Sequence, residues 1–186
     1  MTGISEAKIL IVATNGFEQS ELEFPRDQLR AKGATVHVAT PDGNAIKGWN
    51  DKNWGREAEA DLPISAALVA DYDAIVLPGG QMNPDILRMN DEAVALVHAF
   101  HEAGKVVAAV CHAPWLLIEA GLVKGRNVTS WPSVRTDLIN AGANWHDREV
   151  VVDKGLITSR KPDDLEAFVS KIVEEIEEGR HQRTAA

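Results

Sequence analysis

Short apolar segments, rich in β-branched residues, alternate with helix-forming segments along this chain. Four of the apolar segments have the length of a buried strand, and they cover residues 8–14, 34–40, 74–78 and 105–110. Strands that are apolar along their whole length are typical of parallel sheets that helices cover on both faces. The alternation therefore predicts an α/β fold with a doubly wound, mostly parallel sheet.

The segments between and after these strands complete the predicted architecture. We expect helices at residues 21–33, 63–70, 84–103, 113–121, 134–142 and 162–178. Pro25 fits best in the first turn of its helix, and the helix at 84–103 is expected to break near Asn90 and Asp91. A further strand is predicted at 127–131 and a hairpin at 149–159.

Residues 44–62 are polar and contain two tryptophans, and we expect them to form an irregular excursion from this pattern. The 186 residues are enough to bury a sizeable core, and no linker or repeat divides them. We therefore predict a single domain over residues 1–186, with a frayed tail at 180–186.

The formal net charge of −9 constrains the partners of the chain. An acidic surface repels phosphate backbones and anionic membranes, so we expect neither nucleic-acid nor membrane binding. A single cysteine cannot form an intramolecular disulfide, and the first residues do not resemble a signal peptide. A cytoplasmic location is the expectation that follows.

Unusual residues follow three of the predicted strands. The first strand leads to Glu18, the strand at 74–78 leads to Gly79 and Gly80, and the strand at 105–110 leads to Cys111 and His112. In open α/β sheets, sites form at the carboxyl ends of the strands. We therefore expect these residues to converge on one edge of the sheet.

Two interpretations of Cys111 stay open on the residues alone. A thiol between a strand and a helix resembles a nucleophile elbow, where the helix N-terminus would lower its pKa and favour the reactive thiolate. Free cysteine is also among the most buried residues and often serves as a small apolar side chain. His112 is a candidate base, but only a strained turn would bring the two neighbouring side chains together.

The other candidates carry similar alternatives. Glu18 is either a proton donor to the thiol or an exposed carboxylate at a helix start. The Gly79-Gly80 pair either offers oxyanion-stabilising N–H groups or forms a simple turn. Asn83 and Pro84 resemble a helix cap and first turn, which gives Asp85 a helix-stabilising role on the same edge.

No pattern in the chain indicates a metal or nucleotide site. His98 and His101 are spaced three residues apart, but no further ligand cluster accompanies them. Neither a phosphate-binding loop nor a dinucleotide fingerprint is present. We therefore expect no metal and no cofactor.

Taken together, the motifs resemble a known family. "KILIVATNGFEQSEL", "AIVLPGG" followed by "NPD", and "KVVAAVCHAPWLLIEAGL" are similar to the PfpI-type intracellular protease/deglycase family of the ThiJ/PfpI superfamily. The resemblance covers nearly the whole chain. It implies a flavodoxin-like sandwich of the class I glutamine amidotransferase-like type.

The resemblance also implies roles for individual residues. Cys111 matches the family's nucleophile, His112 matches the histidine that follows it, and Glu18 matches the acidic residue that contacts the cysteine. Gly80 and the backbone N–H of His112 match the proposed oxyanion site. Asp85 matches a carboxylate that completes a triad across a subunit interface, which implies a homo-oligomer, either a dimer or a hexamer.

One further residue is a candidate for substrate binding. Trp49, within residues 44–62, is expected to border the pocket or an oligomer interface. The alternative is that this tryptophan only anchors an edge excursion.

The resemblance implies a cysteine-dependent stress-response hydrolase. The expected activity is deglycase-like or glyoxalase-like, on carbonyl adducts derived from glyoxal or methylglyoxal, with Cys111 as nucleophile. One alternative is an intracellular cysteine peptidase, whose partner is a peptide. Another is a non-enzymatic oxidative-stress sensor in which Cys111 is reversibly oxidised.

Overall fold

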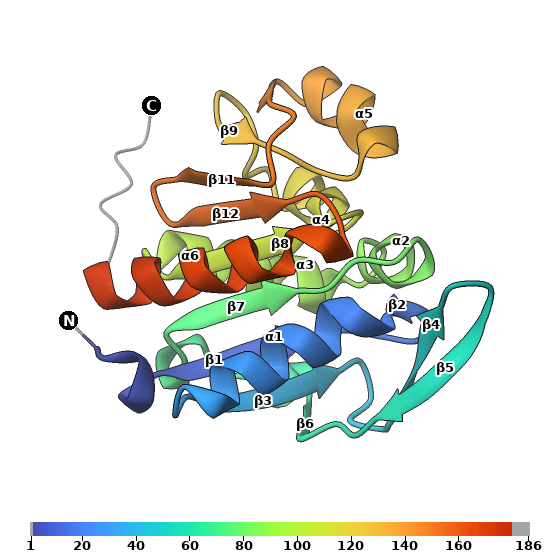
Figure 1. Ribbon diagram of the computed structural model, residues 1–186, viewed down its shortest axis with the longest axis vertical. Helices are drawn as coiled ribbons and strands as arrows, with labels where there is room; N and C mark the ends of the chain where they lie inside the picture. Colours follow the sequence, from blue (N-terminus) through green and yellow to red (C-terminus); the bar gives the residue numbers. More distant parts are fainter. Residues whose placement is uncertain (1, 180–186) are drawn as a thin grey trace.

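The computed structural model describes residues 2–179, so the predicted tail at 180–186 lies outside the described residues. Its centre is a seven-stranded sheet whose strands follow the order β11-β12-β8-β7-β1-β3-β6 (Figure 1). Their bounds are Val150–Asp153, Leu156–Ser159, Val106–Val110, Ala74–Leu77, Lys8–Val12, Thr35–Thr40 and Leu62–Pro63. β11 pairs antiparallel with β12, and the other neighbours are parallel.

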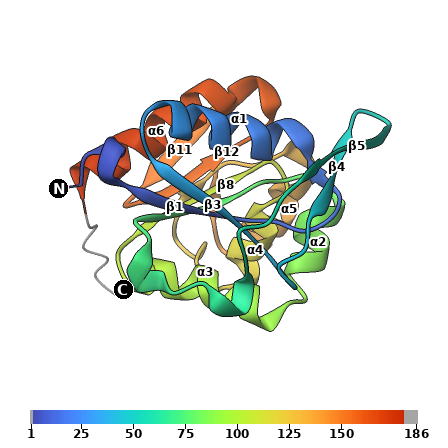
Figure 2. The same ribbon diagram turned by 90° about the horizontal axis from the view of Figure 1, so that it is seen from below.

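Helices cover both faces of this sheet. α1 (Gln19–Ala31) and α6 (Leu165–Glu178) lie together on one face, and α3 (Asp91–Glu102) and α4 (Pro114–Glu119) lie on the other (Figure 2). α2 (Met82–Leu87) and α5 (Arg135–Asn140) pack against α4. The fold is the flavodoxin-like α/β sandwich expected from the sequence.

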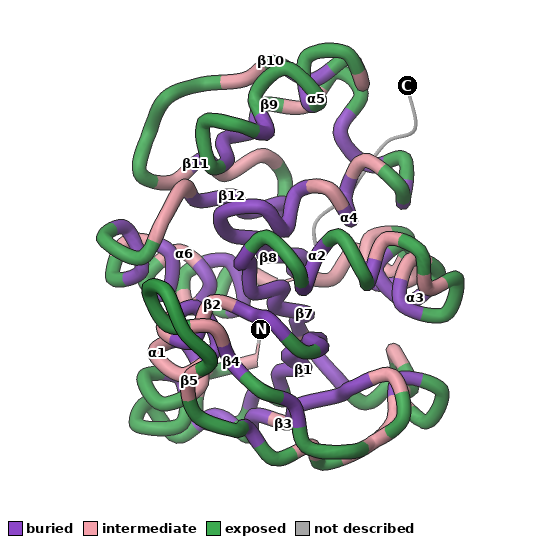
Figure 3. The backbone as a smooth tube through the Cα atoms, turned by 90° about the vertical axis from the view of Figure 1, so that its right-hand side faces the viewer, coloured by how far each residue is buried: buried purple, intermediate pink, exposed green. Residues whose placement is uncertain are grey.

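The core divides into two layers because successive strand residues point to opposite faces. Along β1, Ile9 and Ile11 join the cluster beneath α1 and α6, whereas Leu10 and Val12 join the cluster beneath α3 and α4. All four side chains are fully buried. Figure 3 shows the same burial along β1, β7 and β8. The apolar runs are therefore continuous in sequence because both faces of the sheet are covered.

Residues 44–62 differ from their prediction as an irregular excursion. β4 (Ile46–Asn50) and β5 (Asn53–Ala58) form an antiparallel hairpin that projects beyond the sheet (Figures 1 and 2). β4 also pairs with β2 (Phe17–Glu18), so a tertiary contact supports strands whose own sequence is polar. Figure 3 shows much of this hairpin as exposed.

Several predicted helices have different bounds or types. Pro25 lies in the interior of α1 rather than in its first turn, because α1 begins earlier, at Gln19. The predicted helix at 63–70 is two short 3₁₀ turns, Ile64–Ala66 and Val69–Asp71. The helix predicted at 84–103 begins earlier, at Met82, and is divided into α2 and α3 near Asn90, where the break was expected. The Asn90 side chain caps α3 by accepting from the Ala93 N–H, a role that the sequence did not indicate.

The remaining segments are shorter than predicted. The strand expected at 127–131 is limited to β9 (Asn127–Val128), which pairs in parallel with β10 (Asn144–Trp145). 3₁₀ turns precede α5 and α6, at Pro132–Val134 and Pro162–Asp164. Within residues 2–179, no helix has both the length and the hydrophobicity to cross a lipid bilayer.

Candidate active site

The end of β8 holds Cys111 in a strained backbone conformation. Its φ is 63°, in the left-handed region that costs a residue with a side chain about 1–2 kcal/mol. Backbone bonds on both sides enforce it: the Cys111 N–H donates to the Ser159 carbonyl at 3.0 Å, and the Trp131 N–H donates to the Cys111 carbonyl at 2.9 Å. Strain that neighbouring elements maintain is characteristic of a nucleophile elbow.

This turn brings Cys111 and His112 together. The sulfur lies 3.2 Å from Nδ1 of His112, although adjacent residues in a regular helix would point apart. The imidazole is buried and packs against the indole rings of Trp115 and Trp131, with centroid distances of 5.2 and 6.0 Å. Burial lowers the pKa of His112, so the ring is neutral near pH 7 and able to accept a proton.

Glu21 is the carboxylic acid that meets the sulfur. It is fully buried in the first turn of α1, where its Oε2 accepts a hydrogen bond from the Gly79 N–H at 2.8 Å and its Oε1 has no hydrogen-bond partner among the described residues. A Cβ added to Gly79 would lie within 2.6 Å of both Oε2 of Glu21 and Cβ of Cys111, so the carboxyl and the cysteine are close neighbours. Burial, and then the nearby charge of Glu18, raise the pKa of Glu21 to about 8. The carboxyl beside the cysteine is therefore protonated and neutral at pH 7.

Glu18 does not occupy the position expected for it. It is half-buried at the end of β2, and its oxygen Oε1 accepts a hydrogen bond from the Ser20 hydroxyl at 3.4 Å. Burial raises the pKa of Glu18 as well. The expected contact between Glu18 and Cys111 is therefore corrected to a contact with Glu21, one helical turn further along the chain.

The thiol itself differs from the expectation of a low pKa. Burial raises the pKa of Cys111, and the charge of an ionised Glu21 raises it further. The backbone N–H groups of Gly80 and His112 lower the pKa of Cys111, but the burial effect is larger. α4 has only six residues, which also limits the helix effect that the sequence suggested.

The Gly79-Gly80 turn fits against the nucleophile because it has no side chains. A Cβ on Gly79 would lie 2.6 Å from Cβ of Cys111 and 2.5 Å from Oε2 of Glu21. Gly80 adopts a φ of 81°, where glycine is strongly favoured. The close approach lets the Gly79 N–H reach Oε2 of Glu21 beside the cysteine.

Asn83 holds this turn in place and has a different role from the helix cap predicted for it. α2 begins at Met82, so Asn83 lies inside the helix and is fully buried. Its Oδ1 accepts from the Thr14 N–H at 2.8 Å, and its Nδ2 donates to the Pro78 carbonyl at 2.8 Å. The side chain thereby ties the end of β7 to the end of β1.

Asp85 and Trp49 lie outside this group. Asp85 is exposed in the first turn of α2, whereas Nε2 of His112 lies 3.3 Å from the Ser133 hydroxyl. The indole of Trp49 donates to the Asp51 carbonyl at 2.9 Å and meets Trp54 edge-on, so it anchors the hairpin turn. In the sheet register Trp49 lies beside Glu18.

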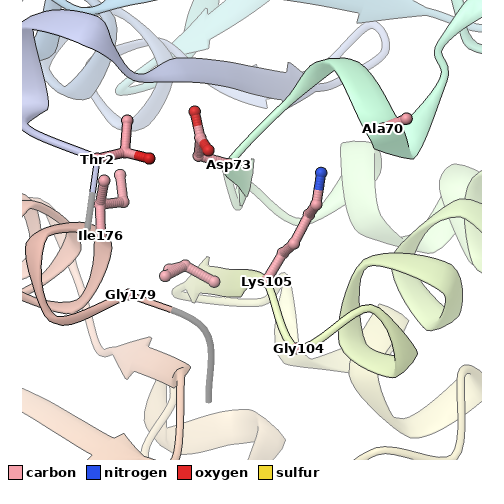
Figure 4. Close-up of a pocket in the computed structure, with 8 residues that line it drawn as sticks. Thr2, Ala70, Asp73, Gly104, Lys105, Ile176 and Gly179 are labelled. Carbon is pink, nitrogen blue, oxygen red and sulfur yellow. The ribbon is translucent and has the colours of Figure 1, made fainter.

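A depression of about 360 Å³ lies at the opposite edge of the sheet from Cys111. Figure 4 shows Asp73 and Lys105, which precede β7 and β8, among the residues that line it. The Lys105 ammonium group donates to the carbonyls of Val69 and Tyr72, and Asp73 accepts from the Lys8 N–H. No cluster of three metal-ligating side chains occurs among residues 2–179.

Sequence reasoning missed three residues around the cysteine: Glu21, Asn83 as a tether, and Ser133. Glu21 had a detectable signal, because it lies three residues after Glu18 and would follow it by about one helical turn. Ser133 had none, because it lies 21 residues from His112 in the chain.

Comparison with known proteins agrees with this architecture. The DJ-1/PfpI family model matches residues 7–175. A Pyrococcus furiosus protein named deglycase PfpI is 40% identical over 166 residues, 89% of this chain and 97% of the relative. An Escherichia coli protein named protein/nucleic acid deglycase 2 is 40% identical over 163 residues, 87% of this chain and 92% of the relative.

The fold has a solved counterpart as well. The crystal structure of Drosophila melanogaster DJ-1beta superimposes with a TM-score of 0.82 and 29% identity, covering 96% of this chain and 95% of that one. The order of the sheet, the strained cysteine after β8 and the match over residues 7–175 lead to one conclusion. The chain belongs to the DJ-1/PfpI family.

Proposed function

We propose that the chain is a cysteine-dependent hydrolase that acts, like a deglycase, on glyoxal- or methylglyoxal-derived adducts of amines and thiols. The observation that carries the proposal is the 3.2 Å contact between the Cys111 sulfur and Nδ1 of a neutral His112, in a strained elbow. Relatives of similar length that are named deglycases support the substrate class.

In the first step, His112 acts as the general base. As the sulfur attacks the carbonyl carbon of the adduct, the thiol proton passes to Nδ1, a carbon–sulfur bond forms, and the carbonyl π electrons move to oxygen. The backbone N–H groups of Gly80 and His112, which also act on the sulfur, are the candidates to stabilise that charge. The bond from the neighbouring carbinol carbon to the amine or thiol then breaks, the departing group takes the proton from the imidazolium, and the carbinol hydroxyl gives its proton to the oxyanion as it becomes an aldehyde. Breakage of the carbon–sulfur bond finally restores the Cys111 thiol and releases the dicarbonyl, which takes up water.

Glu21 supports this step as a neutral acid. Its protonated carboxyl adds no charge beside the sulfur, whereas an ionised carboxylate at the same position would repel a thiolate. The site at rest therefore contains a neutral thiol, a neutral imidazole and a neutral carboxyl. Substrate binding has to precede formation of the nucleophile, which restricts its reactivity towards other electrophiles.

The same features weigh against the two alternatives. Amide hydrolysis needs a firmly oriented imidazole to protonate a poor leaving group, but within a single chain a serine hydroxyl rather than a carboxylate meets Nε2 of His112. Peroxide oxidises thiolates, and burial raises the pKa of Cys111. We therefore place both peptidase and redox-sensor activity behind the deglycase-like reaction.

The homo-oligomer expected from the sequence remains part of the proposal. Asp85 is exposed on α2, so its carboxylate is accessible to a second copy of the chain. Light scattering coupled to size-exclusion chromatography measures the subunit number directly. A monomer at assay concentration would remove the intersubunit role of Asp85.

The test compares wild type with Cys111→Ser on preformed methylglyoxal adducts of an amine and of a thiol. Free methylglyoxal is removed beforehand, and release of the amine or thiol is followed by chromatography. We expect Cys111→Ser to slow release at least about 100-fold. Circular dichroism and thermal unfolding serve as the folding control for the variant.

Three outcomes would contradict the proposal in different ways. Equal release by both proteins would exclude Cys111 as the nucleophile. Consumption of free methylglyoxal without release from adducts would assign a glyoxalase reaction. Cleavage of casein that depends on Cys111, without adduct release, would assign a peptidase.

A further inference from the structure

Ser133 lies opposite the far nitrogen of His112. Its hydroxyl is 3.3 Å from Nε2, on the side of the ring away from the sulfur. Ser133 belongs to the 3₁₀ turn Pro132–Val134, and the residue before that turn, Trp131, donates its N–H to the Cys111 carbonyl at 2.9 Å. The turn that carries Ser133 is therefore fastened to the elbow itself.

The ring of His112 is also held in orientation by this turn. Trp131 stacks on it with an interplanar angle of 23°, and Trp115 packs against it at 5.2 Å. The charged groups around these rings meet the indole of Trp115: Asp137 accepts from its Nε1 at 2.9 Å, and Arg88 lies over it at 5.5 Å. Among the described residues, the hydrogen-bond partner of Nε2 is the neutral hydroxyl of Ser133.

A neutral imidazole carries one proton, and its position decides what the ring can do. If the proton is on Nε2, the lone pair of Nδ1 points to the Cys111 sulfur and can accept the thiol proton. If the proton is on Nδ1, the ring cannot act as a base towards that sulfur. A hydroxyl that accepts from Nε2–H stabilises the first tautomer.

We propose that Ser133 is a positioning residue that selects the catalytic tautomer of His112. Its Oγ accepts the hydrogen bond from Nε2–H and leaves Nδ1 free to accept the proton of Cys111. A hydroxyl orients the ring without adding a negative charge, so His112 stays a neutral base instead of a preformed imidazolium. The catalytic consequence rests on the proposed function, but the tautomer itself does not.

The tautomer can be measured directly by nitrogen NMR of histidine-labelled protein. The chain contains six histidines, so a His112→Gln sample identifies the His112 signals. In wild type we expect the Nε2–H tautomer. Ser133→Ala should shift the two nitrogen signals towards a mixture of tautomers, and Ser133→Thr should restore the wild-type pattern because it keeps the hydroxyl.

Thr136→Ala provides the matched control. Thr136 is an exposed hydroxyl residue of α5, a few positions beyond Ser133. We expect it to leave the His112 signals unchanged. Alkylation of Cys111 by iodoacetamide at pH 7 gives a second readout that requires no substrate, and Ser133→Ala should slow it about tenfold.

The outcomes separate this inference from the proposed function. Unchanged nitrogen signals and an unchanged alkylation rate in Ser133→Ala would overturn the inference, whatever the enzyme's substrate. Shifted signals and slower alkylation would support it, even if the wild-type protein released no amine from adducts. If wild type does turn over adducts, Ser133→Ala should lower kcat more than it changes KM, because Ser133 acts through His112.

Discussion

The polar side chains at the two edges of the central sheet have contrasting environments. At the amino edge, the Lys105 ammonium group donates to two backbone carbonyls and the Asp73 carboxylate accepts from a backbone N–H. Both charged groups therefore have backbone hydrogen-bond partners. At the carboxyl edge, Cys111 and Glu21 are buried together beneath a strained turn, and burial shifts the pKa of each. A depression of about 360 Å³ marks the first edge, whereas strain and shifted pKa values mark the second.

The difference shows which features indicate chemistry in this molecule. The charged groups that line the depression at the amino edge already have hydrogen-bond partners, so its lining does not indicate a catalytic site. A backbone strained at φ 63° and a buried acid with a pKa of about 8 both cost folding free energy, and features of this kind cluster at functional sites. Mutations at the two edges should therefore separate activity from stability.

The largest effect is expected for Gly79→Ala. The added Cβ would lie 2.6 Å from Cβ of Cys111 and 2.7 Å from the Val110 carbonyl, so the turn or the nucleophile must move. A displacement of this kind should reduce kcat/KM for adduct release about 100-fold or more. Steady-state kinetics on the preformed adduct measures the loss.

Gly121→Ala is the matched control for this prediction. Unlike Gly79, Gly121 has a positive φ, 71°, but an added Cβ there would meet no atom within 4 Å. We expect a loss of roughly 1–2 kcal/mol in the free energy of unfolding from backbone strain alone, with kcat/KM unchanged. Equal activity losses in the two variants would show that Gly79 has no special relation to the nucleophile.

A smaller effect, on stability, is expected from the proton on Glu21. Its pKa rises from 4.5 in the unfolded chain to about 8 in the folded one, so between these values the folded chain binds a proton that the unfolded chain releases. The stabilising contribution is fully present below pH 4.5 and is lost as the pH rises towards 8. Wild type should therefore lose roughly 1.4 kcal/mol per pH unit relative to Glu21→Gln.

Urea denaturation of both proteins at several pH values in this window measures the slope. Taking the difference cancels groups with the opposite sign, such as His112, whose lowered pKa makes its own contribution grow with pH. Parallel stability curves for the two proteins would mean that Glu21 is ionised in the folded chain near neutral pH. The site would then hold a negative charge beside the sulfur.

The smallest effect on activity is expected at the amino edge. Lys105→Met removes the ammonium group that bonds the carbonyls of Val69 and Tyr72, and should lower the free energy of unfolding by about 1–3 kcal/mol. kcat/KM should change less than about twofold, because the substitution lies at the far edge of the sheet. A tenfold loss of activity in a folded variant would assign a functional role to the depression and break the contrast between the edges.

The sequence predicts the fold better than the site because the two depend on different information. The apolar runs predict the buried strands β1, β7 and β8, and the position of Cys111 and His112 between an apolar run and a helix predicts a strand-to-helix junction. The sequence does not predict strands β4 and β5, because polar residues dominate them and pairing with β2 stabilises them.

The acidic partner of the cysteine illustrates the same limit at atomic scale. Glu18 immediately precedes α1, and Glu21 lies in its first turn. The observed start of α1 at Gln19 therefore decides which of the two carboxyl groups enters the core. Burial then determines the protonation states, which spacing cannot reveal: the neighbouring helix suggested a low thiol pKa, but desolvation raises it. Ser133 joins the site only through a tertiary turn.

We propose that Cys111 rests as a neutral thiol and is deprotonated by His112 during attack. The thiolate has its own ultraviolet absorbance, so the wild-type spectrum minus that of Cys111→Ser, recorded across pH, measures its ionisation directly. We predict no thiolate signal at pH 7. A full thiolate signal at pH 7 that disappears only in acid would contradict the account, since it would show a preformed nucleophile that burial and Glu21 do not suppress.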